Sequence, residues 1–153
     1  MTSGGGPVER RALLGFWSTD EVYSGNMEHE LVFFGSDGHG WFAWENAGAT
    51  RGSMFTWRTD HGRLTTRTIL DFSDETSGRL RLRPGDGHRF DMDAVPVTRG
   101  VEDGPYGTRP LVLRVPRSST SQAFTERFGY VAPRCPDRWW TEIGRLRRGR
   151  MEL

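Results

Sequence analysis

Few residues in this chain have a type and spacing that suits catalysis. His29 stands between two glutamates, and Glu45 lies on a stretch rich in tryptophan. A carboxylate next to an imidazole can orient the ring for proton transfer, and a carboxylate buried among apolar groups has a raised pKa. Neighbours on a strand point to opposite faces, which places Glu28 and Glu30 poorly for orienting His29. His29 and Glu45 are therefore the candidates for a general acid or base.

Other catalytic chemistry has little support in the sequence. His39, His61 and His88 each stand beside glycine in a turn, where we expect exposed spacers. No two histidines have metal-ligand spacing, and the acidic run at 71–75 lacks the glycine and the final glutamate of a calcium loop. Cys135, the single cysteine, has no histidine near it in the sequence. Phosphate-loop, dinucleotide and Gly-x-Ser-x-Gly patterns are absent, so we expect no metal and no cofactor.

Aromatic residues on neighbouring stretches suit binding better than catalysis. Alternation along a strand places Phe42 and Trp44 of GWFAWEN on one face, and it likewise places Phe55 and Trp57 of SMFTWRT on one face. If the matching faces are internal, they form one aromatic wall with a few polar anchors, as in a ligand pocket. Plain packing is the alternative, because aromatic cross-strand pairs stabilise sheets by about 0.2–1 kcal/mol each. The predicted ligand-binding residues are Phe42, Trp44, Asn46, Phe55, Trp57, Thr66, Thr68, Phe128 and Tyr130.

The elements that would carry these residues read as short strands between turn residues. Asp37-Gly38 and the turn at Asp60–Gly62 predict two consecutive hairpins. Leu80 and Leu82 alternate with arginines, and the alternation resumes after the turn at Pro84–Gly87, which predicts strands with one dry and one wet face. Eight or nine such strands predict an antiparallel meander.

An all-β fold follows from these strands. Closing the sheet into a single antiparallel up-and-down β-barrel of about 8–10 strands would remove its edges, with a two-sheet sandwich as the competitor. The stretch at 137–148 fits a short C-terminal helix capped by Asp137, with Trp139, Trp140 and other apolar residues on one side. A last strand is the alternative there, because Gly144 weakens a helix.

Length and charge limit the possible functions. The 153 residues fit a flexible lead at 1–8, one domain at 9–148 and a tail at 149–153. All 21 basic residues are arginine, yet the net charge is only +1, which argues against nucleic-acid binding. We expect the basic run Arg145–Arg150 to be a solvated end, with an anionic partner as the alternative. No apolar run is long enough for a signal peptide or membrane span, so we expect a cytoplasmic protein without a membrane partner.

The stretch LLGFWSTDE resembles the amino-terminal Gly-x-Trp signature of lipocalins and related calycin barrels, with Gly15 and Trp17 at the matching positions. LVFFGSDGHGWFAW and FTWRTDHGRLTTRT are similar to the strand and turn pattern of small bacterial lipocalin-like domains, and the likeness covers 13–69. The resemblance implies a barrel closed at one end by the tryptophan, with an arginine packed across it. Arg127 and Arg138 are both candidates for that arginine. The chain departs from secreted lipocalins in having no secretion signal and no disulfide pair.

Together these patterns predict a protein that binds a small hydrophobic or aromatic molecule inside a lipocalin-like β-barrel. An enzyme of the cyclase or isomerase type, acting on a hydrophobic metabolite in the same pocket, is the alternative, and Glu45 or His29 inside the pocket would favour it. A second alternative is a protein-interaction module of the inhibitor or immunity type. That module would have a solid barrel and exposed hot spots at Trp41, Trp139 and Trp140.

Overall fold

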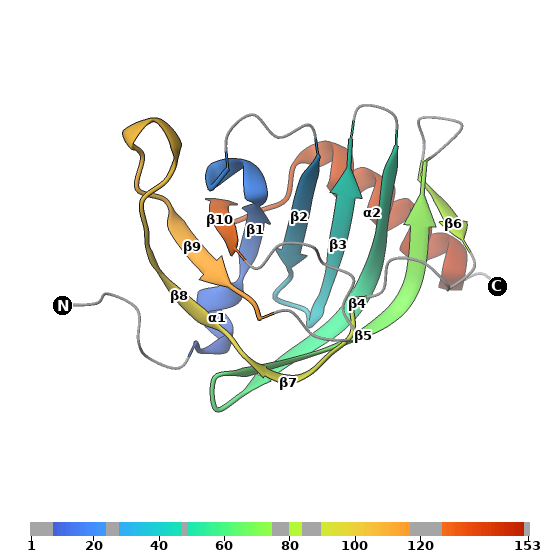
Figure 1. The fold of residues 1–153 in the computed structure, drawn as a ribbon. Coiled ribbons are helices and arrows are strands. Elements are labelled where there is room, and N and C mark those ends of the chain that lie inside the picture. The colour runs from blue at the N-terminus through green and yellow to red at the C-terminus, as the bar shows by residue number, and fades with distance from the viewer. Residues whose placement is uncertain are drawn as a thin grey trace.

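The computed structural model describes residues 8–23, 28–46, 49–74, 80–83, 90–116 and 127–151. They form one antiparallel sheet of ten strands with a helix against one side (Figure 1). The strands are β1 (Gly15–Ser18), β2 (His29–Phe34), β3 (His39–Glu45), β4 (Thr50–Asp60), β5 (Arg63–Ser73), β6 (Arg81–Arg83), β7 (Met92–Pro96), β8 (Thr98–Val101), β9 (Leu111–Arg114) and β10 (Arg127–Ala132). The α-helices are α1 (Arg10–Leu13) and α2 (Asp137–Met151), and the short 3₁₀ turns are η1 (Thr19–Glu21) and η2 (Pro105–Gly107).

Two hairpins, β2–β3 and β4–β5, form the middle of the sheet. Gly38 has a φ of 82° at the first turn, and His61 and Gly62 have φ angles of 50° and 76° at the second. Positive φ at both central residues of the second turn matches the twist of tight β-hairpins, and at each turn the glycine adopts a positive φ that other residues rarely adopt. The two consecutive hairpins expected from the sequence are confirmed.

The order of the described strands gives an all-β fold that is compatible with a barrel, and within these strands the sheet is not closed into a ring. The order is β6-β5-β4-β3-β2-β1-β10-β9-β8, and β7 pairs with β5. β7 and β8 are consecutive in the chain, so Val97 carries the chain from one end of the sheet to the other. Pro96, which has no N–H to donate, ends β7 at this change of partner. The all-β class is therefore confirmed, whereas a ladder that would close a barrel is not formed among the residues that the structure describes.

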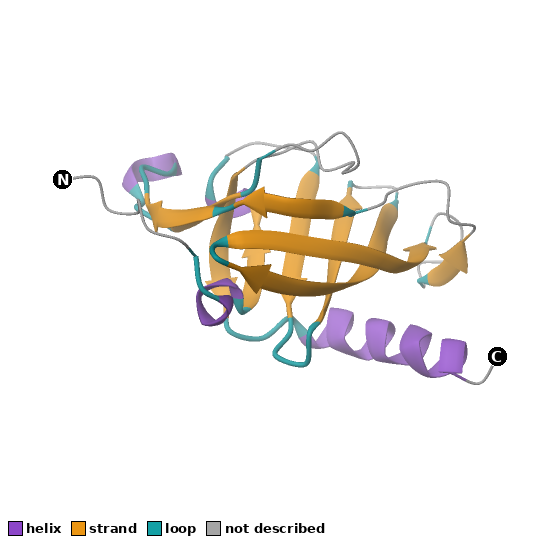
Figure 2. Cartoon of the chain, turned by 90° about the horizontal axis from the view of Figure 1, so that it is seen from below, coloured by secondary structure: helices purple, strands orange, loops and turns teal. Residues whose placement is uncertain are grey.

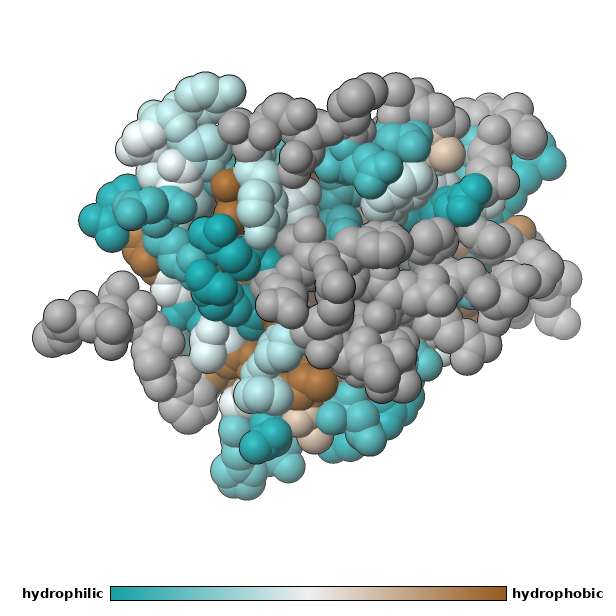
Figure 3. Space-filling view, viewed as in Figure 1, coloured by the Kyte–Doolittle hydropathy of each residue, from teal (hydrophilic) through white to brown (hydrophobic). Residues whose placement is uncertain are grey.

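The inner side of the curved sheet holds one apolar cluster. Its buried aromatic members include Trp17, Phe34, Phe42, Phe55, Phe90 and Phe128. Phe90 stacks on Phe42 at a centroid distance of 5.0 Å and on Phe55 at 4.9 Å. Viewed from the side away from α2, the described surface is mostly hydrophilic, with small hydrophobic areas (Figure 3). Through its two stacks with Phe42 and Phe55, the ring of Phe90 occupies the space beside the predicted aromatic wall.

The outer side of the sheet is covered by α2 (Figure 2). Trp139 stacks on Trp41 with ring centroids 4.7 Å apart and an interplanar angle of 22°. Both tryptophans are buried, together with Ile143 and Leu146 of the same helix. The predicted helix is confirmed, and it extends to Met151, into the residues assigned to a tail. The interaction-module alternative predicted that Trp41 and Trp139 are exposed. This prediction is wrong, because the two rings stack on each other and are buried.

The arginine-rich strand region differs from its predicted alternation. Leu80 is buried, but Leu82 is exposed, so the two leucines do not share a dry face. Arg145 of α2 donates to the backbone oxygen of Leu80, and to Glu142 Oε2 at 3.0 Å. The start of the basic run therefore binds the chain just before β6 and is not a solvated end. The Pro84–Gly87 turn, the 1–7 lead and His88 lie outside the described residues.

Candidate functional site

The predicted ligand-binding residues divide between the inner cluster and the sheet margin. Phe42, Phe55, Trp57 and Phe128 are buried in the inner cluster, and Tyr130 is partly buried against it. Trp44 is partly buried and Asn46 is exposed. The structure therefore brings the predicted aromatic wall together but leaves Asn46 outside it.

Both predicted threonine anchors bind the chain itself. Thr66 Oγ1 donates to the backbone oxygen of Phe90, and Thr68 Oγ1 accepts from the Phe90 N–H at 3.0 Å. Asn46 Oδ1 accepts from the Ala49 N–H at 2.9 Å and so stabilises a turn. These polar groups therefore hold the chain in place, and the threonines fix Phe90 over the inner face.

The two candidates for proton transfer lie apart from the inner cluster. His29 Nδ1 contacts Asp20 Oδ1, a partner from η1 that the sequence neighbours did not indicate. Glu45 lies at the end of β3, where its Oε2 accepts from Thr50 Oγ1 at 3.5 Å. Glu30, next to His29, is buried on the other face. His29 and Glu45 are register partners across β2 and β3, so the structure places them side by side, but on the outer face of the strand ends and away from the inner cluster.

The Gly-x-Trp region is built differently from the expected arrangement. Trp17 is fully buried, its Nε1 donates to the Leu13 oxygen at 2.9 Å, and Tyr130 packs edge-on at 5.2 Å. Arg127 instead lies 2.9 Å from Glu102. The side chain of Arg138, the other candidate, lies outside the described residues.

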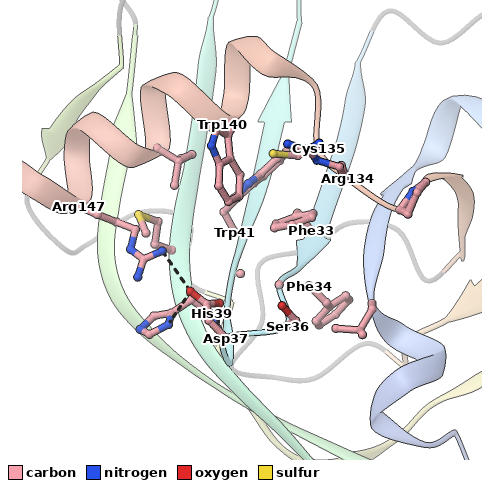
Figure 4. A pocket seen from close by; sticks show the side chains of 16 residues that line it. Phe33, Phe34, Ser36, Asp37, His39, Trp41, Arg134, Cys135, Trp140 and Arg147 are labelled. Carbon is pink, nitrogen blue, oxygen red and sulfur yellow. Dashed lines mark hydrogen bonds and ion pairs between the residues drawn. The ribbon is translucent and has the colours of Figure 1, made fainter.

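A cavity of about 330 Å³ lies on the outer side of the sheet, between α2 and the β2–β3 hairpin (Figure 4). Strands supply Phe33, Trp41 and Met54, which point outward because they alternate with inner residues. The helix supplies Trp140, Ile143 and Arg147 at a spacing of three and four residues, which places them on one helix face. The chain between β10 and α2 adds residues 133–135.

Much of the cavity wall is aromatic. Phe33 and Trp41 are roughly parallel, with centroids 6.1 Å apart. Trp140 is 61% exposed, an unusual state for such a large apolar side chain. Burial raises the pKa of the Cys135 thiol, so at neutral pH this side chain is protonated and is a slow nucleophile. The wall therefore offers flat surfaces suited to an aromatic ring.

One end of the cavity is polar. The His39 N–H donates to Asp37 Oδ1 at 3.0 Å, and Asp37 Oδ2 lies 3.4 Å from Arg147 Nη1. Burial would raise the pKa of Asp37, but this hydrogen bond and the charges of His39 and Arg147 outweigh it and lower that pKa. Asp37 is therefore ionised at neutral pH. His39 Nδ1 is enclosed and makes no hydrogen bond within the described chain.

None of the residues predicted to bind a ligand lines this cavity, although Trp41 and Trp140, predicted only as hot spots of an interaction module, do line it. His39 was expected to be an exposed spacer, yet it begins β3 and is only partly exposed. Its spacing of two from Trp41 gave a signal, because both then share a strand face. Arg147 belongs to the basic run, for which a solvated end is expected, and Cys135 has no histidine near it in the sequence to mark it as functional. Their contribution depends on α2 docking on the sheet.

A second overlooked group lies on the inner side. Ser53 Oγ donates to Asp71 Oδ1 at 2.6 Å, and both residues are buried. Asp71 Oδ2 has no hydrogen-bond partner in the described chain. The sequence pattern at 71–75 gives no sign of this bond, because Ser53 lies on the neighbouring strand. The structure instead makes Asp71 part of a buried hydrogen bond between β4 and β5.

Comparisons with known proteins give no relative. The chain matches no protein-family model, and no match was found among curated proteins or solved structures. Across the described residues, no three histidine, cysteine or acidic side chains gather where they could hold a metal. None of the described helices is both long and apolar enough to cross a membrane.

Proposed function

We propose that this protein binds a small aromatic or hydrophobic molecule in the cavity between α2 and the β2–β3 hairpin. The observation that carries the proposal is an aromatic-walled cavity of about 330 Å³ with charged groups at its margin. Small-molecule pockets in proteins have volumes of about 300–1,000 Å³, with mostly apolar linings and a few polar groups. The cavity has both properties.

Binding would be driven by removal of apolar surface from water, at about 25 cal/mol per Å². Phe33 and Trp140 provide surfaces for a planar ring, while Asp37, His39 and Arg147 would set its orientation. The class of ligand is the one the sequence suggested. Its place is different, because Phe90 fills the inner face beside Phe42 and Phe55.

Trp140→Ala tests the aromatic wall. We expect this variant to bind 2-naphthamide, a neutral planar probe, at least tenfold more weakly than the unaltered protein in isothermal titration calorimetry. Trp140 is largely exposed, so the fold should survive its truncation. Tyr106→Ala is the matched control, because Tyr106 is a 90% exposed aromatic residue that does not line the cavity. Equal affinities of the two variants would contradict the proposal.

Cys135 reports where the probe binds. It lines the cavity and is the only cysteine of the chain, so alkylation by iodoacetamide at about pH 9, where part of this thiol is ionised despite its raised pKa, has one thiol target. Saturating 2-naphthamide should slow this alkylation several-fold, since the ligand blocks the approach to the sulfur. Binding that left the alkylation rate unchanged would place the probe elsewhere and overturn this location.

A further inference from the structure

We infer, resting on the function proposed above, that the ligand is an aromatic anion whose carboxylate or similar group is held by Arg134. The cavity lining contains Arg134 and Arg147 but only one carboxylate, that of Asp37. Its net charge is therefore positive even when His39 is left out. The question is then which of these charges is open to a ligand.

Arg134 has an open guanidinium. It lies between β10 and α2, is exposed, and makes no hydrogen bond or ion pair with the described part of the chain. Figure 4 shows it beside Cys135, away from the end of the cavity that holds Arg147. A guanidinium presents five N–H donors in a planar fork that matches a carboxylate. Beside an apolar wall, such a group is suited to pair with an anionic ligand.

Asp37 is already neutralised. Its Oδ1 accepts from the backbone of His39, and its Oδ2 faces Arg147 at 3.4 Å and His39 Nδ1 at 3.5 Å. A cationic ligand would have to compete with these groups for the one carboxylate of the cavity. It would also meet the unpaired charge of Arg134. The arrangement therefore selects against cations and for anions.

Three planar probes of nearly equal shape separate charge from shape: 2-naphthoate, neutral 2-naphthamide and cationic 2-naphthamidine. In calorimetry at low salt we expect the carboxylate to bind about tenfold more tightly than the amide, and the amidine to bind most weakly. Arg134→Gln should abolish the preference for the carboxylate while leaving the affinity for the amide within about twofold, since a paired guanidinium supplies the difference.

Two further arginine variants make the assignment specific. Arg109→Gln, at an exposed position outside the cavity lining, should retain the full preference for 2-naphthoate. Arg147→Gln should reduce the preference less than Arg134→Gln does, because Asp37 already shares the Arg147 charge. The opposite order would overturn the role of Arg134.

The remaining outcomes separate this inference from the proposed function. Equal binding of all three probes, with protection of Cys135, would leave the proposed function standing and overturn the charge preference. Tightest binding of the amidine would also overturn the preference for an anion, and it would indicate that Asp37, not Arg134, pairs with the ligand. No binding of any probe would overturn the proposed function itself.

Discussion

At the scale of single residues, Glu102 connects two strands through their arginines. Its carboxylate accepts from Arg114 Nε at 2.7 Å and Nη2 at 2.6 Å, and it lies 2.9 Å from Arg127 Nη2. The hydrogen bond from Arg114 lowers the pKa of Glu102, and this effect exceeds the opposing effect of burial. One side chain near the end of β8 therefore ties β9 to β10. Sequence spacing could not pair these residues, because they lie on separate elements.

Glu102→Gln should lower the free energy of unfolding by about 1 kcal/mol at pH 7. A carboxylate with a depressed pKa stabilises the fold fully above its unfolded pKa, near the ordinary value of 4.5, and this stabilisation is lost as the pH falls through the folded pKa. The difference between the two proteins should thus be constant at neutral pH and shrink below about pH 4.5. Urea unfolding at several pH values measures it.

Asp93→Asn is the control for this experiment. Asp93 also faces an arginine, Arg67 at 3.1 Å, but its side chain is 86% exposed. Solvent screens such a pair, so we expect little change in stability at any pH. A Glu102→Gln difference that stayed constant down to pH 3 would contradict the role of the ionised carboxylate.

At the scale of elements, α2 covers the outer face of β3 and forms there a second apolar cluster with the cavity beside it. β3 carries tryptophan on both faces, so its pattern predicted a strand but could not decide which face would be internal. Trp139 stacks on Trp41 from almost 100 residues further along the chain and contributes to its burial, together with Phe16 and Phe33. Local patterning therefore predicted both elements, whereas their contact and the cavity beside it depend on long-range packing.

Adjacent tryptophans of α2 give a direct test of this docking. Trp139→Ala should lower the free energy of unfolding by about 3–5 kcal/mol, because a buried aromatic ring is replaced by a void. Trp140→Ala should cost less than about 1 kcal/mol, because most of that ring is already in water. Urea denaturation measures both. Similar losses for the two variants would show that α2 is not held by the Trp41 stack.

At the scale of the whole molecule, the inner side of the sheet is enclosed by the chain itself. The predicted alternation correctly placed Phe90 and Met92 on the dry side, and both are buried. It did not show that β7 leaves β5 at Val97 to continue as β8 beside β9. That crossing needs partners from both ends of the sheet, which no local window of sequence contains. A likeness to ligand-holding barrels could therefore predict the class of fold but not the packed inner side.

Phe90→Ala should convert this packed side into a ligand site. We expect a loss of about 3–5 kcal/mol in stability, because the ring is fully buried against Phe42 and Phe55. The space left would be lined by apolar groups, and such engineered cavities bind benzene. Benzene should therefore raise the melting temperature of Phe90→Ala but not that of the unaltered protein or of Tyr106→Ala. A rise of equal size in all three would contradict this filling role.

The place of β1 has a consequence for the order in which the molecule can be made. The first strand pairs on one side with β10, the last strand, through contacts such as Trp17 with Tyr130. During synthesis the hairpins β2–β3 and β4–β5 can form early, since their partners are adjacent in the chain. β1 can gain its second neighbour only after residue 132 has left the ribosome. A sheet joined in its middle by such distant segments has a high contact order, which is associated with slow folding. Until then, the growing chain has an unpaired strand edge in the middle of its sheet.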